Sequence, residues 1–107
     1  MADKITTPLP LRLKQARTAM GISQKALGIK LGMEPGTASA RMNHYEKGKH
    51  TPDYTTLKRM ADELGVPVAY FFCESEKSAQ LVCLLEALSD AKKDVLIENL
   101  KKDLDST

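Results

Sequence analysis

At 107 residues, 42% of them hydrophobic and only five aromatic, the chain has room for one compact domain with an aliphatic core and a modest extension. No apolar run is long enough to span a bilayer, and the first residues lack the apolar stretch of a signal peptide, so we expect a cytoplasmic protein that does not enter a membrane. The net charge of +2 is too small to indicate a class of partner by itself.

Five helices are predicted in the first two thirds of the chain, at residues 11–20, 24–31, 37–46, 54–64 and 68–73. Residues that suit helix starts precede three of them: Pro10, Ser23 and Asp53. Glycines, which favour the left-handed conformation that ends a helix, follow three: Gly21, Gly32 and Gly65. The Pro-Gly content of residues 33–36 predicts a turn before the third helix.

Apolar residues recur at three- and four-residue spacing along these helices, which predicts one inward face on each. The expected inward residues are Leu13, Ala16, Met20, Leu27, Leu31, Met42, Tyr45, Leu57, Met60, Ala61, Leu64, Val68, Phe71 and Phe72. No strand pattern is present, so we expect an all-α protein.

Residues 74–78 form a charged break, which predicts a junction between a domain at 9–73 and a helical extension at 74–107. An apolar helix around residues 81–88 and a last helix, capped by Ser89 and running to about Leu104, follow this break. Residues 1–73 hold 11 Lys and Arg against 6 Asp and Glu, a balance of +5, whereas residues 74–107 hold 5 against 8, a balance of −3. A basic N-terminal part followed by an acidic C-terminal part is typical of a nucleic-acid-binding domain joined to a segment with another role.

Two short helices joined by a tight turn within a basic bundle can place the second helix in the major groove of DNA. The outer face of the third predicted helix offers small or polar side chains that suit base contacts: Ser39, Ala40, Asn43 and His44. Gln24, at a helix N-terminus, is expected to reach a phosphate. Further phosphate contacts are expected from three residues just beyond the third helix: Lys47, Lys49 and His50.

Residues 12–72 resemble the Cro/cI-type (xenobiotic-response-element type) helix-turn-helix domain of phage repressors and bacterial regulators. The matching pieces, in chain order, are Leu13 with Ala16-Arg17, Gly21-Ile22-Ser23-Gln24 with Leu27, Tyr45-Glu46-Lys47-Gly48-Lys49 with Pro52, and Leu57 with Met60-Ala61, Leu64-Gly65-Val66 and Phe71-Phe72. The resemblance implies a five-helix, lambda-repressor-like DNA-binding domain, here followed by two C-terminal helices. It also implies a structural ion pair between Arg17 and Glu46, a DNA contact at Gln24, and base reading at the four outer residues of the third helix.

One departure from the family pattern lies between Gly32 and Tyr45, where this sequence has about four additional residues. They either lengthen the turn or add a turn to the start of the third helix, and four residues keep the inward face in phase either way. Base-reading positions are therefore counted back from Glu46, and Thr37 and Ala38 become candidates for extra groove contacts.

Two side chains near the expected interface have two interpretations each. Arg41 either contacts a phosphate or pairs with Glu34 across the turn, and Tyr54 either contacts the DNA backbone or packs beside the fourth helix.

The C-terminal leucines either pack on their own domain or form a dimer seam, and a dimer is favoured because it reads two half-sites about 34 Å apart. The expected seam residues are Leu81, Leu84, Leu85, Leu88, Leu96 and Leu100, with Tyr70 and Phe71 as possible additions.

Catalysis, metal binding and cofactor binding are not expected, because the sequence lacks a nucleophile–base pair, metal-ligand spacing and a phosphate-cradling glycine loop. Cys73 and Cys83 are expected to be small, partly buried hydrophobic residues rather than a disulfide framework. The sequence thus predicts a homodimeric, sequence-specific regulator of double-stranded DNA that represses from a palindromic operator. The alternative is an antitoxin or partner-controlled repressor whose C-terminal helices bind a toxin or an anti-repressor.

Overall fold

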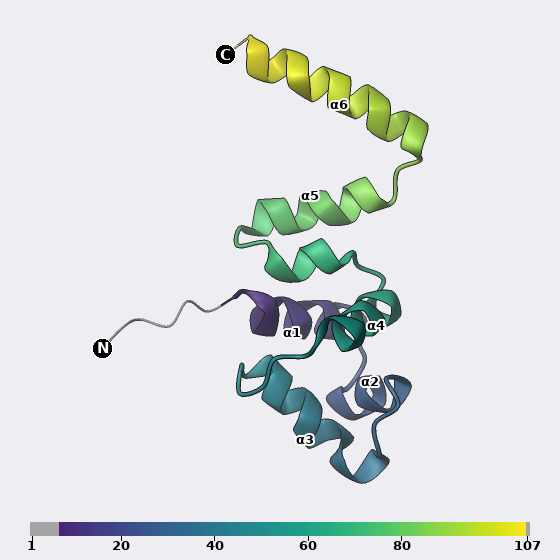
Figure 1. Cartoon of the computed structure of the whole chain (residues 1–107). Coiled ribbons are helices and arrows are strands. Elements are labelled where there is room, and N and C mark those ends of the chain that lie inside the picture. The colour runs from purple at the N-terminus through teal and green to yellow at the C-terminus, as the bar shows by residue number, and fades with distance from the viewer. Residues whose placement is uncertain (1–6, 107) are drawn as a thin grey trace, which may run out of the picture.

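The computed structural model describes residues 7–106, and all regular structure within this range is helical (Figure 1). The elements are α1 (Leu9–Ala19), α2 (Gln24–Lys30), α3 (Pro35–Glu46), α4 (Tyr54–Leu64), the 3₁₀ helix η1 (Val68–Phe72), α5 (Glu76–Glu86) and α6 (Asp90–Asp105). The prediction of an all-α fold is confirmed.

The first five elements surround one core, and each contributes a side chain with no exposed surface. These side chains are Leu13, Leu27, Met42, Met60 and Phe71. All five were expected to face inward from their spacing, because a helix that packs on one side repeats its apolar residues every three or four positions. The core is aliphatic and methionine-rich, with Phe71 as its one fully buried aromatic side chain among the described residues.

Side-chain oxygens cap four of the helices by accepting a hydrogen bond from the first turn. Ser23 caps α2, Asp53 caps α4, Ser75 caps α5 and Ser89 caps α6. The bond from the Thr56 N–H to Asp53 is 2.8 Å long, and hydrogen bonding to Thr56 holds the pKa of Asp53 below its usual 3.8. This cap therefore stabilises the fold above pH 3.8 and is lost as the pH falls through the lowered value.

The predicted turn at residues 33–36 is wrong in its second half, because α3 already begins at Pro35. Proline fits the first helical position, where its missing N–H would have no partner within the helix. The Glu34 carbonyl accepts the first helical bonds, from the N–H groups of Thr37 and Ala38 at 3.0 and 2.9 Å. The additional residues of the departure therefore lengthen α3 by part of a turn at its N-terminus.

Two residues expected in the core are exposed instead. Met20 is the C-cap of α1 and keeps the helical bond to the Ala16 carbonyl, but at this end of the helix its side chain is exposed. Phe72 is exposed because residues 68–72 form a 3₁₀ helix, in which side chains three positions apart share a face. Val68 and Phe71 occupy that inner face, and Phe72 follows on the outside.

Close packing of α2 on α3 depends on the glycine in the middle of α2. A Cβ atom built at Gly28 would lie 2.8 Å from the Ala38 Cβ and 3.1 Å from the Ala38 carbonyl oxygen. Both residues are buried, so the two helix backbones meet here with nothing larger than a methyl group between them. Ala38 is consequently a packing residue, and its expected role as an extra groove contact is wrong.

Gly28→Ala is expected to destabilise the protein by about 1–2 kcal/mol, because overpacking costs about 1–3 kcal/mol and the better helix propensity of alanine returns at most about 1. Gly36→Ala is the matched control, since a Cβ at Gly36 meets nothing within 4 Å. Chemical denaturation followed by circular dichroism should show the first variant less stable and the second equal to the parent or slightly more stable. Equal stability of the two variants would contradict the close contact.

The C-terminal helices extend from this domain (Figure 1). The break predicted at residues 74–78 is shorter in the structure, because α5 already begins at Glu76 and packs on η1 through the buried Ala79. α6 then turns away and buries none of its residues. The radius of gyration is 16.5 Å, against about 13 Å for a compact chain of this length. The extension is thus an arm that projects from the domain.

Both cysteines lie in this region, and neither forms a disulfide. Cys73 and Cys83 are half-buried, and burial raises the pKa of the Cys83 thiol above its usual 9.0. A thiol that stays protonated is a poor nucleophile, so Cys83 acts as a small packing residue on the inner side of α5.

Candidate DNA interface

The outer face of α3 and the first residue of α2 form one continuous surface. Thr37, Ser39 and Ala40 are exposed on the first two turns of α3, and Asn43 and His44 are half-buried on the third. Gln24 begins α2, directly beside Asn43. The structure therefore brings together all five side chains that the sequence assigned to base contacts and one assigned to a phosphate.

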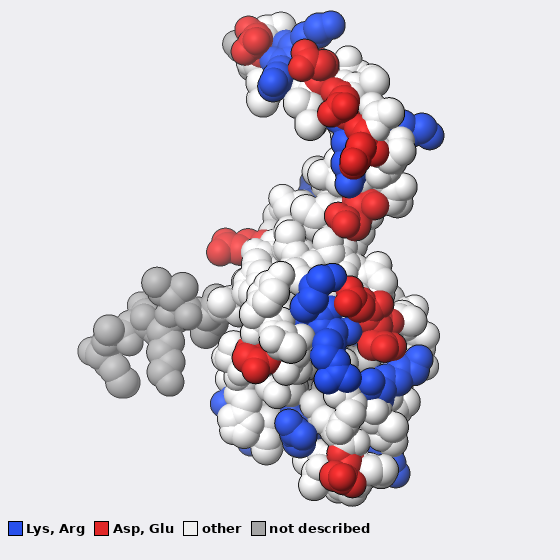
Figure 2. Space-filling model, turned by 45° about the vertical axis from the view of Figure 1, so that its right-hand side comes forward, with Lys and Arg blue, Asp and Glu red and all other residues white. Residues whose placement is uncertain are grey.

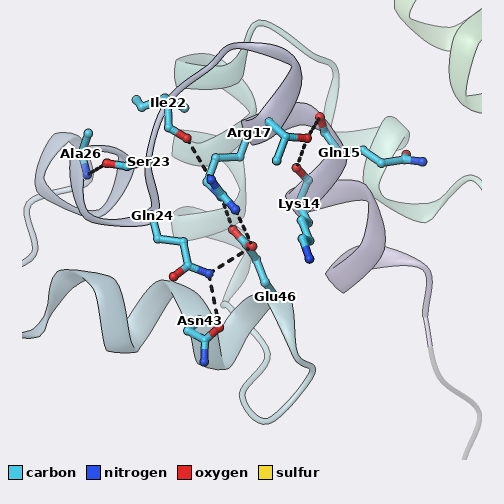
Figure 3. Close-up of polar contacts among 10 residues, drawn as sticks. Lys14, Gln15, Arg17, Ile22, Ser23, Gln24, Ala26, Asn43 and Glu46 are labelled. Atoms are coloured by element: carbon cyan, nitrogen blue, oxygen red, sulfur yellow. Dashed lines mark hydrogen bonds and ion pairs between the residues drawn. The ribbon is translucent and has the colours of Figure 1, made fainter.

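A hydrogen-bonded network holds these two helices in register (Figure 3). The Gln24 Nε2 group donates to Asn43 Oδ1 at 3.3 Å and to Glu46 Oε1 at 3.2 Å. Glu46 in turn accepts two bonds from the Arg17 guanidinium, at 2.5 Å from Nε and 3.0 Å from Nη2. The Arg17–Glu46 ion pair thus holds Gln24 in place, and Gln24 in turn holds the outward-facing side chain of Asn43.

The Arg17–Glu46 ion pair is well shielded from solvent, with side-chain exposures of 13% and 3%. Arg17 also donates to the Ile22 carbonyl at 2.9 Å, so α1 is tied to both the entry of α2 and the end of α3. Hydrogen bonding to Glu46 raises the pKa of Arg17, so the guanidinium keeps its charge far above neutral pH.

The residues after α3 fold back against its C-terminus. Gly48 adopts a left-handed φ of 75°, which lets the Lys49 N–H reach the His44 carbonyl at 2.9 Å. The rings of His44 and His50 meet edge to face, with centroids 4.9 Å apart. Lys47 and Lys49 are exposed on this turn, directly after α3, so their ammonium groups remain accessible.

The structure bears on the two interpretations given for Arg41 and on the two given for Tyr54. Arg41 is exposed on α3 and forms no ion pair with Glu34 among the described residues, which leaves its guanidinium available to a phosphate. Tyr54 is exposed at the start of α4, so the alternative in which it packs beside that helix is wrong.

The two parts of the chain differ in charge balance, although both signs are present on the surface of each. Figure 2 shows acidic side chains following one another along α6 with lysines beside them, and a basic patch on the helical domain next to a cluster of acidic side chains. The excess of basic residues lies in the first 73 residues and the excess of acidic residues in the remainder, so the domain is the part of the chain that attracts phosphates more strongly.

Two residues important for this arrangement were not identified from the sequence. Gly28 permits the close approach of α2 and α3, and an isolated glycine inside a helix gives no indication of what it faces. Arg12 is 1% exposed and binds groups that lie more than 60 residues further along the chain. Helical periodicity detects only local neighbours, so neither contact could be found in it.

The expected dimer-seam leucines differ in exposure: Leu81, Leu84 and Leu100 are exposed, whereas Leu85, Leu88 and Leu96 are half-buried. Ala79, Val82 and Cys83 occupy the side of α5 that packs on η1, whereas the leucines of α5 lie on the opposite side. Leu81 and Leu84 are 57% and 59% exposed. Phe71 has no exposed surface, so its suggested place in a seam is wrong.

Comparison with known proteins supports the same region and architecture. The sequence profile of the helix-turn-helix family matches residues 13–71, which is more than half of the chain. A crystal structure of the transcriptional regulator BswR superposes with a TM-score of 0.80 at 39% identity, covering 88% of this chain and 93% of that one.

Two curated relatives match about three fifths of the chain. An uncharacterized HTH-type transcriptional regulator of Sinorhizobium medicae is 34% identical over 61 residues, or 57% of this chain and 41% of the relative. An uncharacterized transcriptional regulator in the ATPase CF(0) region of Rhodospirillum rubrum is 30% identical over 66 residues, or 62% of this chain and 57% of the relative. The chain thus spans less than two thirds of the length of these relatives.

Within residues 7–106, no helix is long and apolar enough to cross a membrane.

Proposed function

Because the chain belongs to the Cro/cI-type helix-turn-helix family of transcriptional regulators, which are not enzymes, we propose that it is a repressor that binds a palindromic operator as a homodimer. The helix-turn-helix domain binds DNA, with α3 in the major groove. Base contacts come from the outer face of α3. Phosphate contacts come from Arg41, Lys47, Lys49 and His50, and from the backbone N–H of Gln24 at the start of α2, because both Nε2 hydrogens of Gln24 are donated to Asn43 and Glu46. Bound at a promoter, such a protein excludes polymerase.

The observation that carries base reading is the Gln24–Asn43–Glu46 network. An asparagine recognises adenine by donating from Nδ2 and accepting at Oδ1. The bond from Gln24 uses one lone pair of Asn43 Oδ1 and fixes the orientation of the amide, while a second lone pair and the Nδ2 donor stay available. Asn43 is therefore held ready for a bidentate contact before DNA arrives.

The observation that supports a homodimer is the two-sided character of α5. One side packs on η1, and the opposite side presents Leu81 and Leu84 to solvent, with the half-buried Leu85 on the same helix and the half-buried Leu88 just past its end. On α6, Leu96, Ile97 and Leu100 lie within one stripe of the helix surface, and Ile97 and Leu100 are about half exposed. Apolar surface of this extent on a small domain marks an interface, and a second copy of the chain supplies a matching surface by two-fold symmetry.

Selection of bound duplexes from a random pool tests the proposal. The expected product is an inverted repeat whose half-sites are centred about 34 Å, or ten base pairs, apart. Sedimentation equilibrium of the free protein should give twice the chain mass. Enrichment of a single unpaired half-site, or no enrichment at all, would contradict a palindromic operator, and a monomer that acquires mass only with another protein would favour a partner-controlled regulator.

Asn43→Ala is expected to remove discrimination at one base pair per half-site, at about 1–3 kcal/mol each, because its amide supplies the bidentate contact. Fluorescence anisotropy against the selected operator and against its single-base variants measures this loss. Lys49→Ala is the matched control, since a phosphate contact should weaken all duplexes equally and leave base preference unchanged. If the two variants produced the same pattern, the division of roles would be wrong.

A further inference from the structure

The junction between the helical domain and the arm is built around Arg12. This arginine lies in the first half of α1, and its side chain is 1% exposed. Its guanidinium donates to the Cys73 carbonyl at 2.8 Å and the Glu74 carbonyl at 3.1 Å. Both acceptors belong to the short segment that connects η1 to α5. A connection that could have been flexible is therefore held to α1 by a buried cation.

A carboxylate at the first position of α5 completes this set of contacts. Glu76 Oε1 accepts from Arg12 Nη1 at 2.7 Å and from Gln15 Nε2 at 3.0 Å. The Glu76 side chain is 70% exposed, so it reaches the buried guanidinium from the surface. Hydrogen bonds from Gln15 and Arg12 keep the pKa of Glu76 below its usual 4.5, so the carboxylate is ionised at neutral pH and the contact is lost only on acidification below that value.

The remaining neighbours leave the guanidinium little freedom to move. Arg12 Nη1 also donates to Gln15 Oε1 at 2.8 Å, and the same oxygen accepts from the Tyr70 hydroxyl at 3.2 Å. The Tyr70 ring lies 6.0 Å from the guanidinium carbon. Burial raises the pKa of Tyr70, so this hydroxyl stays a donor. The planar guanidinium of Arg12 thus joins α1, η1 and α5. A lysine ammonium at the same place could not make this set of bonds.

α1 therefore carries two arginines with two different attachments. Arg17 is bonded to Glu46 at the end of α3, and Arg12 is bonded to the start of α5. We propose that the Arg12–Glu76 contact fixes the angle between the DNA-reading helices and the α5–α6 arm, and so sets the separation of the two half-sites that a dimer recognises. The proposal rests on the homodimeric regulator proposed above.

The geometry makes such control sensitive to small rotations. The long axis of the molecule is 55 Å, so the reading helix lies at the end of a substantial lever from the arm. A rotation of about 10° over about 20 Å moves that helix by about 3.5 Å, which is the rise of one base pair. A junction that swings by this amount would accept operators whose half-sites are one base pair closer or further apart.

The test compares half-site spacings in otherwise identical duplexes. Palindromes built from the selected half-site, with spacings changed by one and two base pairs in each direction, are titrated with the parent protein, Glu76→Ala and Arg12→Lys. Glu86→Ala is the matched control, because Glu86 is an exposed carboxylate at the other end of α5. A duplex with one half-site, and sedimentation equilibrium of each protein, report on DNA reading and on assembly separately.

The parent and Glu86→Ala should lose about tenfold or more in affinity when the spacing changes by one base pair, and the two junction variants about threefold or less. Half-site affinity and dimer mass should stay within about twofold of the parent. A junction variant that keeps the parent's spacing preference would overturn the proposal, as would a loss of affinity that is equal for half-sites and palindromes. A monomeric parent protein, or one that binds no palindrome, would instead overturn the homodimer and this proposal with it. In Glu76→Ala the guanidinium keeps its bonds to Gln15 and to the Cys73 and Glu74 carbonyls, so this variant tests the proposal even where Arg12→Lys fails to fold.

Discussion

Glu46→Ala is expected to lower the free energy of unfolding by about 3–5 kcal/mol, because it leaves the Arg17 guanidinium largely shielded from water without its counter-ion. Only the bond from Arg17 to the Ile22 carbonyl would remain among its described contacts. Gln24 would also lose its bond to Glu46, so α2 would be less firmly held against α3. Chemical denaturation followed by circular dichroism measures the change.

A double replacement separates the value of the ion pair from the cost of breaking it. Arg17→Met with Glu46→Leu removes both charges together, and such exchanges of a buried pair are often nearly neutral. Asp62→Ala is the control for a pair in solvent, since Lys58 and Asp62 are exposed although their charged atoms lie 2.6 Å apart. A loss below about 1 kcal/mol for Glu46→Ala would show that the pair is well hydrated after all.

Operator binding is expected to weaken about 2,000-fold when the salt concentration rises from 50 to 200 mM, because cationic side chains displace counter-ions from DNA. Arg41, Lys47 and Lys49 give three cations per protomer and six per proposed dimer, for a slope of about −5.4 in log affinity against log salt. Titrations by fluorescence anisotropy at four or five salt concentrations yield this slope.

Lys49→Ala removes two of these six cations per dimer and should reduce the slope to about −3.6, or about 150-fold over the same range. Asn43→Ala is the control, because a base contact releases no counter-ion and the slope should stay at its parent value. A parent slope flatter than about −2 would mean that the residues after α3 do not follow the phosphates.

Much of the fold could be predicted because helix ends and inward faces are local properties. Ser23, Asp53 and Ser89 were recognised as caps since a hydroxyl or carboxylate before an apolar run satisfies the free N–H groups of the first turn. The errors arose where local rules compete. Pro35 is compatible with both a turn and a helix start, and in the structure it takes the first helical position after an extended Glu34, whose carbonyl accepts the first helical bonds.

The contacts that position the interface could be predicted only in part. The Arg17–Glu46 pair was inferred from family resemblance and is present in the structure. Arg12 lies on the same helix and is the more deeply buried of the two, yet its partners are two backbone carbonyls and a carboxylate on another helix. Every residue has a backbone carbonyl, so the sequence does not show which carbonyls bind a charged side chain. In the sequence, Arg12 therefore could not be distinguished from an arginine exposed to solvent.

The isolation of α6 has a consequence for how the chain folds. This 16-residue helix buries none of its side chains in its own chain, and a helix of that length is only marginally stable in water without tertiary contacts. The capping hydroxyl of Ser89 stabilises its first turn, but the exposed side chains of the apolar stripe, Ile97 and Leu100, contribute little until another surface covers them. In the proposed homodimer, the order of α6 therefore depends on protein concentration as well as on sequence, and folding of the arm and assembly of the dimer become a single equilibrium.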